Sequence, residues 1–365
     1  MDLGEYEQSK FAIADILRSA AACAPEQTPA LHERIQPLFA RLAEDRFNLV
    51  VVGRFNRGKT SLMNAILTTD RLPTGIVPLT SVITTVCYGS KERAVLKFRN
   101  SIFDKEISID ELPQYITQQG NPGNVQRITT AEIHLPAEIL RRGFYFVDTP
   151  GLGSVIVENT LTTEAFLPEA DAFVFVTSYE SPLSEEEVRF LRAASSSGKR
   201  TFVVLNKHDT VSAAERELVL RFVREQLNDF YGPTPPPVFS MSSIDGLAAK
   251  QSGNQALLVA SGIAEFERQL GGFLLNEKGE QFLLRMCDRI REFLQELPKS
   301  KDNEALALQI SALRQQLATQ ELVEPPRPLP RRPLLFPICI SSKPAKSAPK
   351  SPMSFGIFCA STNMM

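Results

Sequence analysis

The sequence lacks tryptophan and has only three histidines and five cysteines, which lie far apart along the chain. No two cysteines form a C-x-x-C pair, so neither a zinc framework nor a set of disulfides is expected. The histidines, His32, His134 and His208, are equally dispersed. We therefore expect each of them to be a core or surface residue rather than a metal ligand.

The chain also lacks a strong charge and a long apolar run. Its 365 residues carry a formal net charge of −2, which gives no electrostatic reason to expect a nucleic-acid partner. The first ten residues are polar and acidic, unlike a secretory signal. No apolar run reaches the length of about 18 residues that spans a bilayer. We expect a soluble, cytoplasmic protein, for which any membrane contact is peripheral.

What the chain does contain is a change of hydrophobic period near residue 47. Residues 7–45 place apolar side chains at helical spacing and predict two helices, separated by Pro25 and Pro29. Short β-rich runs then follow, and several are apolar throughout, as strands covered on both faces are. These runs are 47–52, 82–88, 94–98, 129–135, 144–148, 172–177, 201–206 and 237–241.

Helical patterns lie between the predicted strands, and one begins at Ser184 with Glu187 in the position of a capping box. The alternation predicts an α/β fold with a doubly wound, mostly parallel sheet. After about residue 255 only helix is indicated, with an interruption at Pro298. Residues 325–352 are rich in proline and contain no acidic residue, so we expect this tail to be disordered or polyproline-like.

A phosphate-binding loop is indicated between the first predicted strand and the helix after it. The stretch reads Gly53-x-x-x-x-Gly58-Lys59-Thr60, and its place between strand and helix is the context that this motif needs. Backbone N–H groups at the helix start would hold phosphate oxygens, Lys59 would reach the β- and γ-phosphates, and Thr60 would bind Mg²⁺. The predicted contacts are Gly53, Arg54, Phe55, Asn56, Arg57, Gly58, Lys59, Thr60 and Ser61.

Two further motifs follow apolar strands in the order that a nucleotide site requires. Asp148 and Gly151 form a D-x-x-G motif, in which the carboxylate holds Mg²⁺ through water and the glycine N–H senses the γ-phosphate. The run Asn206-Lys207-x-Asp209 ends a later strand. A carboxylate there accepts from the ring N–H and exocyclic amine of guanine, a donor pair that adenine lacks, so the nucleotide is predicted to be GTP.

Two weaker assignments complete the predicted site. Ser242 and Ser243 are candidates to place backbone N–H groups near guanine O6. A switch threonine that supplies a hydroxyl to Mg²⁺ is expected between the first two motifs, and we choose Thr80 because it lies in a loop before a strand. The alternatives are Thr74, Thr84 and Thr85, of which Thr84 and Thr85 lie inside the predicted strand, where β-propensity alone explains threonine.

The stretches GRFNRGKTSLMNAIL, LPTGIVPLTSVITTVCYG, DTPGLGS and NKHD together resemble a bacterial dynamin-like GTPase over roughly residues 5–320. The resemblance implies a P-loop NTPase fold with extra strands between Thr80 and Asp148. It also implies that helices before and after the G domain form a neck bundle, although both sets of helices could instead cap the sheet. The implied domains are 1–46 (N-terminal neck), 47–277 (GTPase domain), 278–323 (C-terminal neck) and 324–365 (tail).

The resemblance has one clear departure. Dynamin relatives are usually longer, with a helical trunk and a membrane-binding tip, and the pattern after about Val323 is typical of a truncated or frameshifted end. This weakens the expectation of membrane remodelling but leaves the GTPase expectation intact. Two other classes stay open: an Era-like ribosome- or RNA-associated GTPase, and a truncated GTP-binding module without turnover.

The expected chemistry is hydrolysis of GTP to GDP and phosphate with Mg²⁺. Leu152 occupies the position where Ras-like enzymes place a water-orienting glutamine, so other groups must assist. Asn56 could hold K⁺ beside the phosphates, or Arg57 could act as an arginine finger in cis, and a solvated loop arginine is the third possibility for Arg57. Pairing of two G domains in a homodimer would complete either device, as it does in dynamin relatives.

Overall fold

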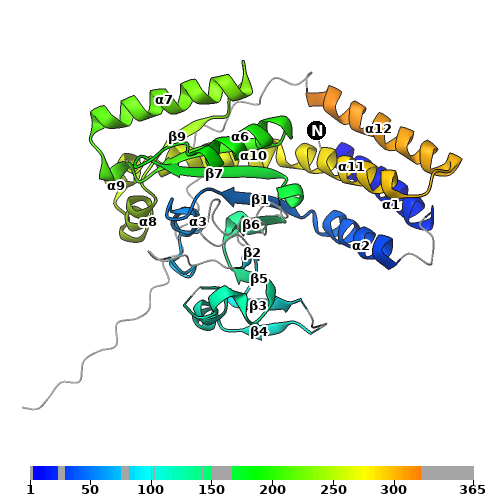
Figure 1. The fold of residues 1–365 in the computed structure, drawn as a ribbon, viewed down its shortest axis with the longest axis horizontal. Helices are drawn as coiled ribbons and strands as arrows, with labels where there is room; N and C mark the ends of the chain where they lie inside the picture. The colour runs from blue at the N-terminus through cyan, green and yellow to red at the C-terminus, as the bar shows by residue number, and fades with distance from the viewer. Residues whose placement is uncertain are drawn as a thin grey trace, which may run out of the picture. The chain divides into compact units, whose positions relative to one another are not determined.

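The structure, a computed structural model, describes residues 3–23, 29–74, 82–99, 101, 103–117, 119–141, 143–149 and 167–321. The predicted tail after residue 323 lies outside these residues. Within them the chain forms one nine-stranded sheet with helices on both faces, in the order β4-β3-β5-β2-β6-β1-β7-β8-β9 (Figure 1). The strands are β1 (Phe47–Val52), β2 (Ile83–Tyr88), β3 (Arg93–Phe98), β4 (Lys105–Ile107), β5 (Ile128–Leu135), β6 (Phe144–Asp148), β7 (Ala172–Ser178), β8 (Arg200–Asn206) and β9 (Val238–Ser240).

The half of the sheet from β6 to β9 is parallel and buried. Strand β1 pairs in parallel with both β6 and β7, and β8 pairs in parallel with β7 and β9. All residues of β1 and β7 are buried, which explains their apolar sequences. Because parallel strands end at the same edge, this half of the sheet brings the three predicted motifs together.

The other half of the sheet is an insertion between the first two motifs. Strand β2 runs antiparallel to β6 and parallel to β5, and β3 lies antiparallel to both β5 and β4. The extra strands that the resemblance implied are therefore present. The short strand β4 was not predicted, because its sequence, Lys105-Glu106-Ile107, offers a single buried side chain.

Helices cover both faces of the parallel half, as expected for a doubly wound sheet. Apolar residues of α3 and α10 pack on one face, and those of α6 and α7 pack on the other. The capping box predicted at Ser184 is formed, with Glu187 bonded back to the Ser184 N–H. The helices between β1 and the terminal helices are α3 (Lys59–Leu67), α4 (Pro113–Ile116), α6 (Glu185–Ser196), α7 (Ala213–Tyr231), α8 (Ser243–Ser252), α9 (Gln255–Ala260) and α10 (Ile263–Asn276).

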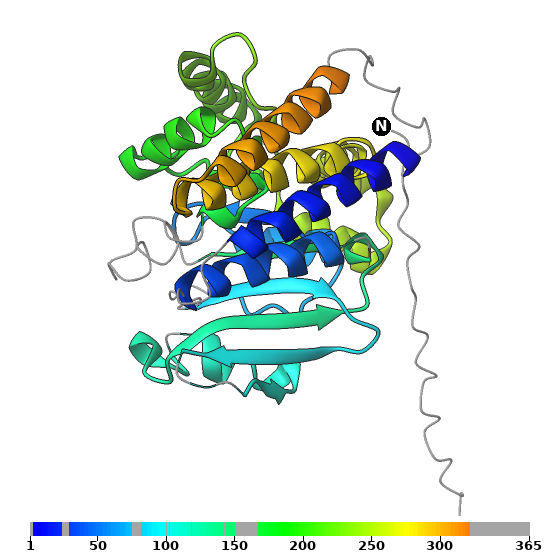
Figure 2. The same cartoon turned by 90° about the vertical axis from the view of Figure 1, so that its right-hand side faces the viewer.

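The terminal helices pack against one another. They are α1 (Leu3–Cys23), α2 (Pro29–Glu44), α11 (Lys278–Glu296) and α12 (Lys301–Glu321). Helix α11 contacts the other three, and α1 also contacts α2 and α12 (Figures 1 and 2). The predicted helical bundle is thus formed, although Pro29 begins α2 rather than lying before it. No helix among the described residues is both long and apolar enough to cross a bilayer.

A buried charge cluster joins this bundle to the sheet. Asp171, just before β7, is fully buried and accepts bonds from Arg41 of α2 at 2.6 Å and from Arg289 of α11 at 2.8 Å. The backbone N–H of Asn48, in β1, donates to the same carboxylate at 2.8 Å. One carboxylate therefore ties two bundle helices to the start of the two central strands.

Candidate GTP-binding site

The loop from residue 53 to residue 58 is shaped by two glycines that a side chain could not replace. A Cβ at Gly53 would lie 2.1 Å from the carbonyl oxygen of Val176, in β7. Gly58 has φ +84°, and a Cβ there would lie 2.3 Å from Asn206 Nδ2. Both contacts are shorter than van der Waals distances allow, so the loop can lie this close to β7 and β8 only with glycine at these positions.

The start of α3 presents backbone N–H groups without a competing side chain. Its N-cap is Gly58, which makes no side-chain capping bond. Lys59 begins the helix and is buried, and its ammonium donates to the carbonyl oxygens of Gly53 at 3.1 Å and Arg54 at 3.2 Å. Burial lowers the pKa of Lys59, while the nearby carboxylate of Asp148 opposes that shift. A buried cation at a helix N-terminus is suited to bind a phosphate group.

Thr60 and Asp148 meet at the edge of the sheet. The Thr60 hydroxyl donates to Asp148 Oδ2 at 2.8 Å, and both residues line a small pocket together with Thr84 and Ile116. Burial raises the pKa of Asp148, whereas Lys59 and the Thr60 bond lower it. Asp148 Oδ1 is buried without a hydrogen-bond partner in the described part of the chain. A hydroxyl beside an unpartnered carboxylate oxygen fits Mg²⁺ and its waters, which prefer hard oxygen ligands.

Asn206 links the predicted guanine motif to the phosphate loop. Its Nδ2 donates to the carbonyl oxygen of Arg57 at 3.0 Å. Its Oδ1 accepts from the backbone N–H of Ser243 at 3.0 Å and from the Ser243 hydroxyl at 2.9 Å. Asn206 is therefore a structural clamp between β8, α8 and the loop, a role that its N-K-x-D motif alone does not reveal.

Lys207 and Asp209 lie in the turn that follows β8. Lys207 has φ +63° and reverses the chain, and its ammonium is 3.3 Å from Glu180 Oε1. Asp209 follows in the 3-10 helix His208–Thr210 and is exposed. An exposed carboxylate at the end of a buried strand can receive a base, whereas the buried His208 next to it is held by the Met241 carbonyl through its backbone N–H.

Arg57 differs most from the sequence expectations. It is 6% exposed, so the possibility of a solvated loop arginine was wrong. Its guanidinium donates to Ser178 Oγ at 2.7 Å, to the Ser181 carbonyl at 2.6 Å and to Glu187 Oε1 at 3.3 Å. An arginine-finger role would require these buried bonds to break. The sequence predicted a role for Glu187 in the capping box of α6 but gave no sign of its ion pair with Arg57.

The remaining predicted residues have different positions. Asn56 is exposed, with φ +62°, at the turn of the loop, and Arg54, Phe55 and Ser61 are half-buried. The Ser242 N–H donates to Ser261, and its hydroxyl caps α8. The backbone N–H groups of Ser242 and Ser243 thus donate to Ser261 and Asn206. Each would have to give up this bond before it could donate to guanine O6. Thr80, Gly151 and Leu152 lie outside the described residues.

Comparison with known proteins agrees with this geometry. Residues 49–208 match the model of the dynamin family. The match covers less than half of the chain and shows a segment that is similar to the dynamin-family GTPase domain. This similarity favours the dynamin group over the Era-like alternative. It also agrees with the inserted strands β3–β5, which separate the phosphate loop from Asp148.

Two curated relatives and one solved structure illustrate the similarity. An uncharacterised Caldicellulosiruptor protein, encoded 3′ of xynA, is 37% identical over 254 residues, which is 70% of this chain and 63% of that protein. A probable transmembrane GTPase, FZO-like, of Arabidopsis thaliana chloroplasts is 32% identical over 210 residues, 57% of this chain and 20% of that protein. An oligomerised bacterial dynamin pair shares the fold, with a TM-score of 0.55 at 20% identity, over 87% of this chain and 50% of that one. The chain spans less than two thirds of the length of each.

Proposed function

We propose that the chain binds GTP with Mg²⁺ and hydrolyses it to GDP and phosphate. The observation that carries the proposal is the bond from Asn206 to the Arg57 carbonyl, because it holds the N-K-x-D motif against the phosphate loop. With the phosphate chain of GTP on this loop, the guanine base would lie beside Asp209. Lys59 would exchange its two carbonyl partners for β- and γ-phosphate oxygens.

The Mg²⁺ would be held by residues from three segments. Thr60 and Asp148 are already bonded to each other, and the ion supplies positive charge against the β- and γ-phosphates. Thr80 is our candidate for the third ligand, and the N–H of Gly151 for the sensor of the γ-phosphate. Arg54, Phe55 and Ser61 complete the cradle around the phosphates.

Assistance to the attacking water must come from a group other than Leu152. Arg57 is engaged by Glu187 and Ser178, which leaves Asn56 as the favoured device. An exposed asparagine amide at the turn of the loop can bind K⁺ through its oxygen, and a second G domain would close the site. We therefore propose that turnover is low in the monomer and rises when the G domains dimerise.

Initial rates of phosphate release at increasing protein concentration test this proposal. We expect specific activity to rise with protein concentration, to require Mg²⁺, and to be higher in K⁺ than in a larger organic cation at equal ionic strength. Binding of GTP without any turnover at high protein concentration would instead support the truncated interaction module. Absence of GTP binding would contradict the proposal altogether.

A peripheral membrane contact is the second part of the proposal. The oligomerised bacterial dynamin pair with the same fold is described as sensing and tethering membranes over long range, and this motivates the suggestion. We further propose that the terminal helices α1, α2, α11 and α12 act as a neck between the GTPase domain and such a contact. Flotation with anionic liposomes, with and without GTP, tests it, and recovery of all protein in the unbound fraction would contradict it.

A further inference from the structure

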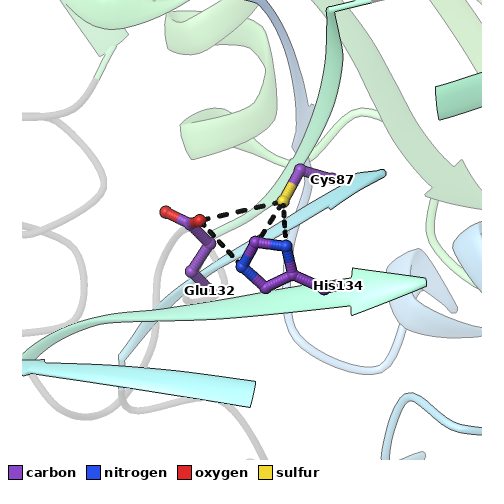
Figure 3. Close-up of side chains that lie close together, drawn as sticks. All are labelled: Cys87, Glu132 and His134. Carbon is purple, nitrogen blue, oxygen red and sulfur yellow. Dashed lines mark hydrogen bonds and ion pairs between the residues drawn. The ribbon is translucent and has the colours of Figure 1, made fainter. Parts of the chain in front are cut away.

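Three side chains with metal-binding groups, Cys87, Glu132 and His134, point toward one another in the inserted half of the sheet (Figure 3). Cys87 comes from β2, and Glu132 and His134 come from β5. The parallel pairing of these strands sets Cys87 directly opposite His134, and Glu132 lies two residues earlier on the same face of β5. The cluster is therefore built by strand register, which spacing along the sequence cannot indicate.

The three donor atoms form a compact triangle. Cys87 Sγ is 3.8 Å from Glu132 Oε1 and 4.0 Å from His134 Nε2, and Nε2 is 3.0 Å from Oε1. With zinc bond lengths of about 2.0–2.3 Å and tetrahedral angles, ligand atoms lie roughly 3.4–3.6 Å apart. Each side of the triangle thus needs to change by only about half an ångström to enclose the ion.

The surroundings hold these side chains in place. Cys87 is 3% exposed, and the side chains of Glu132 and His134 are 19% and 13% exposed. A Cβ on Gly89 would lie 2.5 Å from the Cβ of His134, so the glycine makes room for the imidazole. Lys97 lies 3.6 Å from Glu132 Oε2, which leaves Oε1 directed at the cysteine and histidine.

A second chemistry for this trio, a thiol nucleophile with a histidine base, does not fit. Burial raises the pKa of Cys87 to about 12, with a further contribution from Glu132, so the group is a thiol at neutral pH. A nucleophilic cysteine needs a depressed pKa and access for a substrate. A metal ion can still bind a buried thiol, because coordination displaces the thiol proton, and the raised pKa then makes the metal affinity increase with pH.

We propose that Cys87, Glu132 and His134 bind a zinc-class divalent cation, with water in the fourth position. A thiolate and a carboxylate balance the double charge of the ion, and the mixture of sulfur, nitrogen and oxygen suits Zn²⁺ rather than Mg²⁺. The positive charges of Lys97, Arg46 and Arg93 nearby weaken the affinity without removing the ligands. The site is separate from Thr60 and Asp148.

The bound ion would tie the inserted strands to the strand that passes the nucleotide site. Thr84 of β2 pairs with Asp148, and Cys87 lies three residues further along the same strand, about 10 Å away. Metal binding would therefore stiffen β2 against β5 next to the nucleotide edge.

Spectroscopic titration of the full chain with Co²⁺ and Zn²⁺ tests the proposal. The titration is made with excess Mg²⁺ and without nucleotide, in a background with Cys339→Ser and Cys359→Ser so that tail thiols give no signal. We expect one equivalent of Co²⁺ to produce a thiolate-to-cobalt charge-transfer absorption that Zn²⁺ abolishes. Cys87→Ser should remove this absorption, and Cys287→Ser, at a buried cysteine of α11, should retain it.

Two further variants keep the test decisive if Cys87→Ser fails to fold. Glu132→Gln and His134→Gln each remove one ligand, and each should weaken Zn²⁺ binding by at least about tenfold. Removing only a residue that hydrogen-bonds to a metal ligand already costs about that much, and removing the ligand itself should cost more. Zn²⁺ should also raise the melting temperature of the parent protein but not of Glu132→Gln. No charge-transfer absorption in the parent, or absorption that persists in Cys87→Ser, would overturn the proposal.

Discussion

Asn206 Nδ2 donates to the carbonyl oxygen of Arg57 at 3.0 Å, across 149 residues of sequence. The bond is made possible by Gly58, since a Cβ there would collide with the same Nδ2. It places the turn that carries Asp209 next to the loop that carries Lys59. The proposed base and phosphate contacts are thus coupled through one buried amide, and the predictions below start from that coupling.

The phosphate loop gives the first prediction. Lys59→Ala removes a buried ammonium that would make two charge-assisted bonds to phosphate, each worth about 1.5–3 kcal/mol, so GTP affinity should fall about 100-fold or more. Thr60→Ala should weaken the dependence on Mg²⁺, and Thr60→Ser should preserve it. Calorimetric titration with GTP measures both. Lys91→Ala, at an exposed lysine, is the control, and equal affinities in all variants would mean that residues 53–60 form only a turn.

The second prediction is that Arg57 stabilises the fold whereas Asn56 assists turnover. Arg57→Ala leaves Glu187, which is fully buried, without its ionic partner, and such a loss costs about 3–5 kcal/mol. We therefore expect a large fall in the free energy of unfolding. Asn56→Ala should leave stability nearly unchanged but remove the preference of turnover for K⁺. Chemical denaturation and phosphate release measure the two effects.

The matched control for Arg57→Ala is Arg221→Ala, at an exposed position of α7, which should change stability by no more than about 0.5 kcal/mol. If Arg57→Ala remained fully stable and lost only turnover, and if the ion made no difference, the arginine-finger interpretation would be correct instead.

Sequence patterns predicted the strands of the parallel half almost to the residue, because they are buried on both faces and their apolar runs have sharp ends. The glycines and motifs also located Thr60 next to Asp148. What the sequence could not predict depends on tertiary contacts. The burial of Arg57 against Glu187 and the meeting of Cys87 with His134 are set by strand register and by packing across more than forty residues.

The junction between bundle and sheet gives the third prediction. Asp171→Asn removes the buried charge that pairs with both Arg41 and Arg289. Arg41 keeps only the half-exposed Glu169, at 3.0 Å, and a buried guanidinium that loses its buried partner is strongly destabilising. The free energy of unfolding should fall by about 3–5 kcal/mol. Asp229→Asn, at an exposed aspartate of α7, serves as the control. Equal stability of the two variants would show that the junction contributes nothing.

Lys199 makes stability depend on pH near the same junction. Burial, assisted by Arg289 and Arg285, lowers its pKa from 10.5 to about 8. Between these values the unfolded chain keeps a proton that the folded chain has lost, so the free energy of unfolding rises with pH across this window. Lys199→Gln should flatten that rise, whereas Lys91→Gln should not. Thermal melts at about pH 8 and about pH 10 measure it, and parallel profiles of wild type and Lys199→Gln would contradict it.

Nucleotide selectivity tests the central claim most directly. Asp209 is exposed in the turn after β8, and we propose that its carboxylate recognises guanine through two charge-assisted bonds, each worth about 1.5–3 kcal/mol. Competition binding should therefore rank GTP at least about 100-fold above ATP for the wild type. Asp209→Asn should lower the affinity for GTP and raise the affinity for xanthosine triphosphate. The control Asp229→Asn should keep the wild-type ranking of nucleotide affinities. If the wild type binds ATP as tightly as GTP, or if Asp209→Asn leaves the ranking unchanged, the assignment of this site to GTP is wrong.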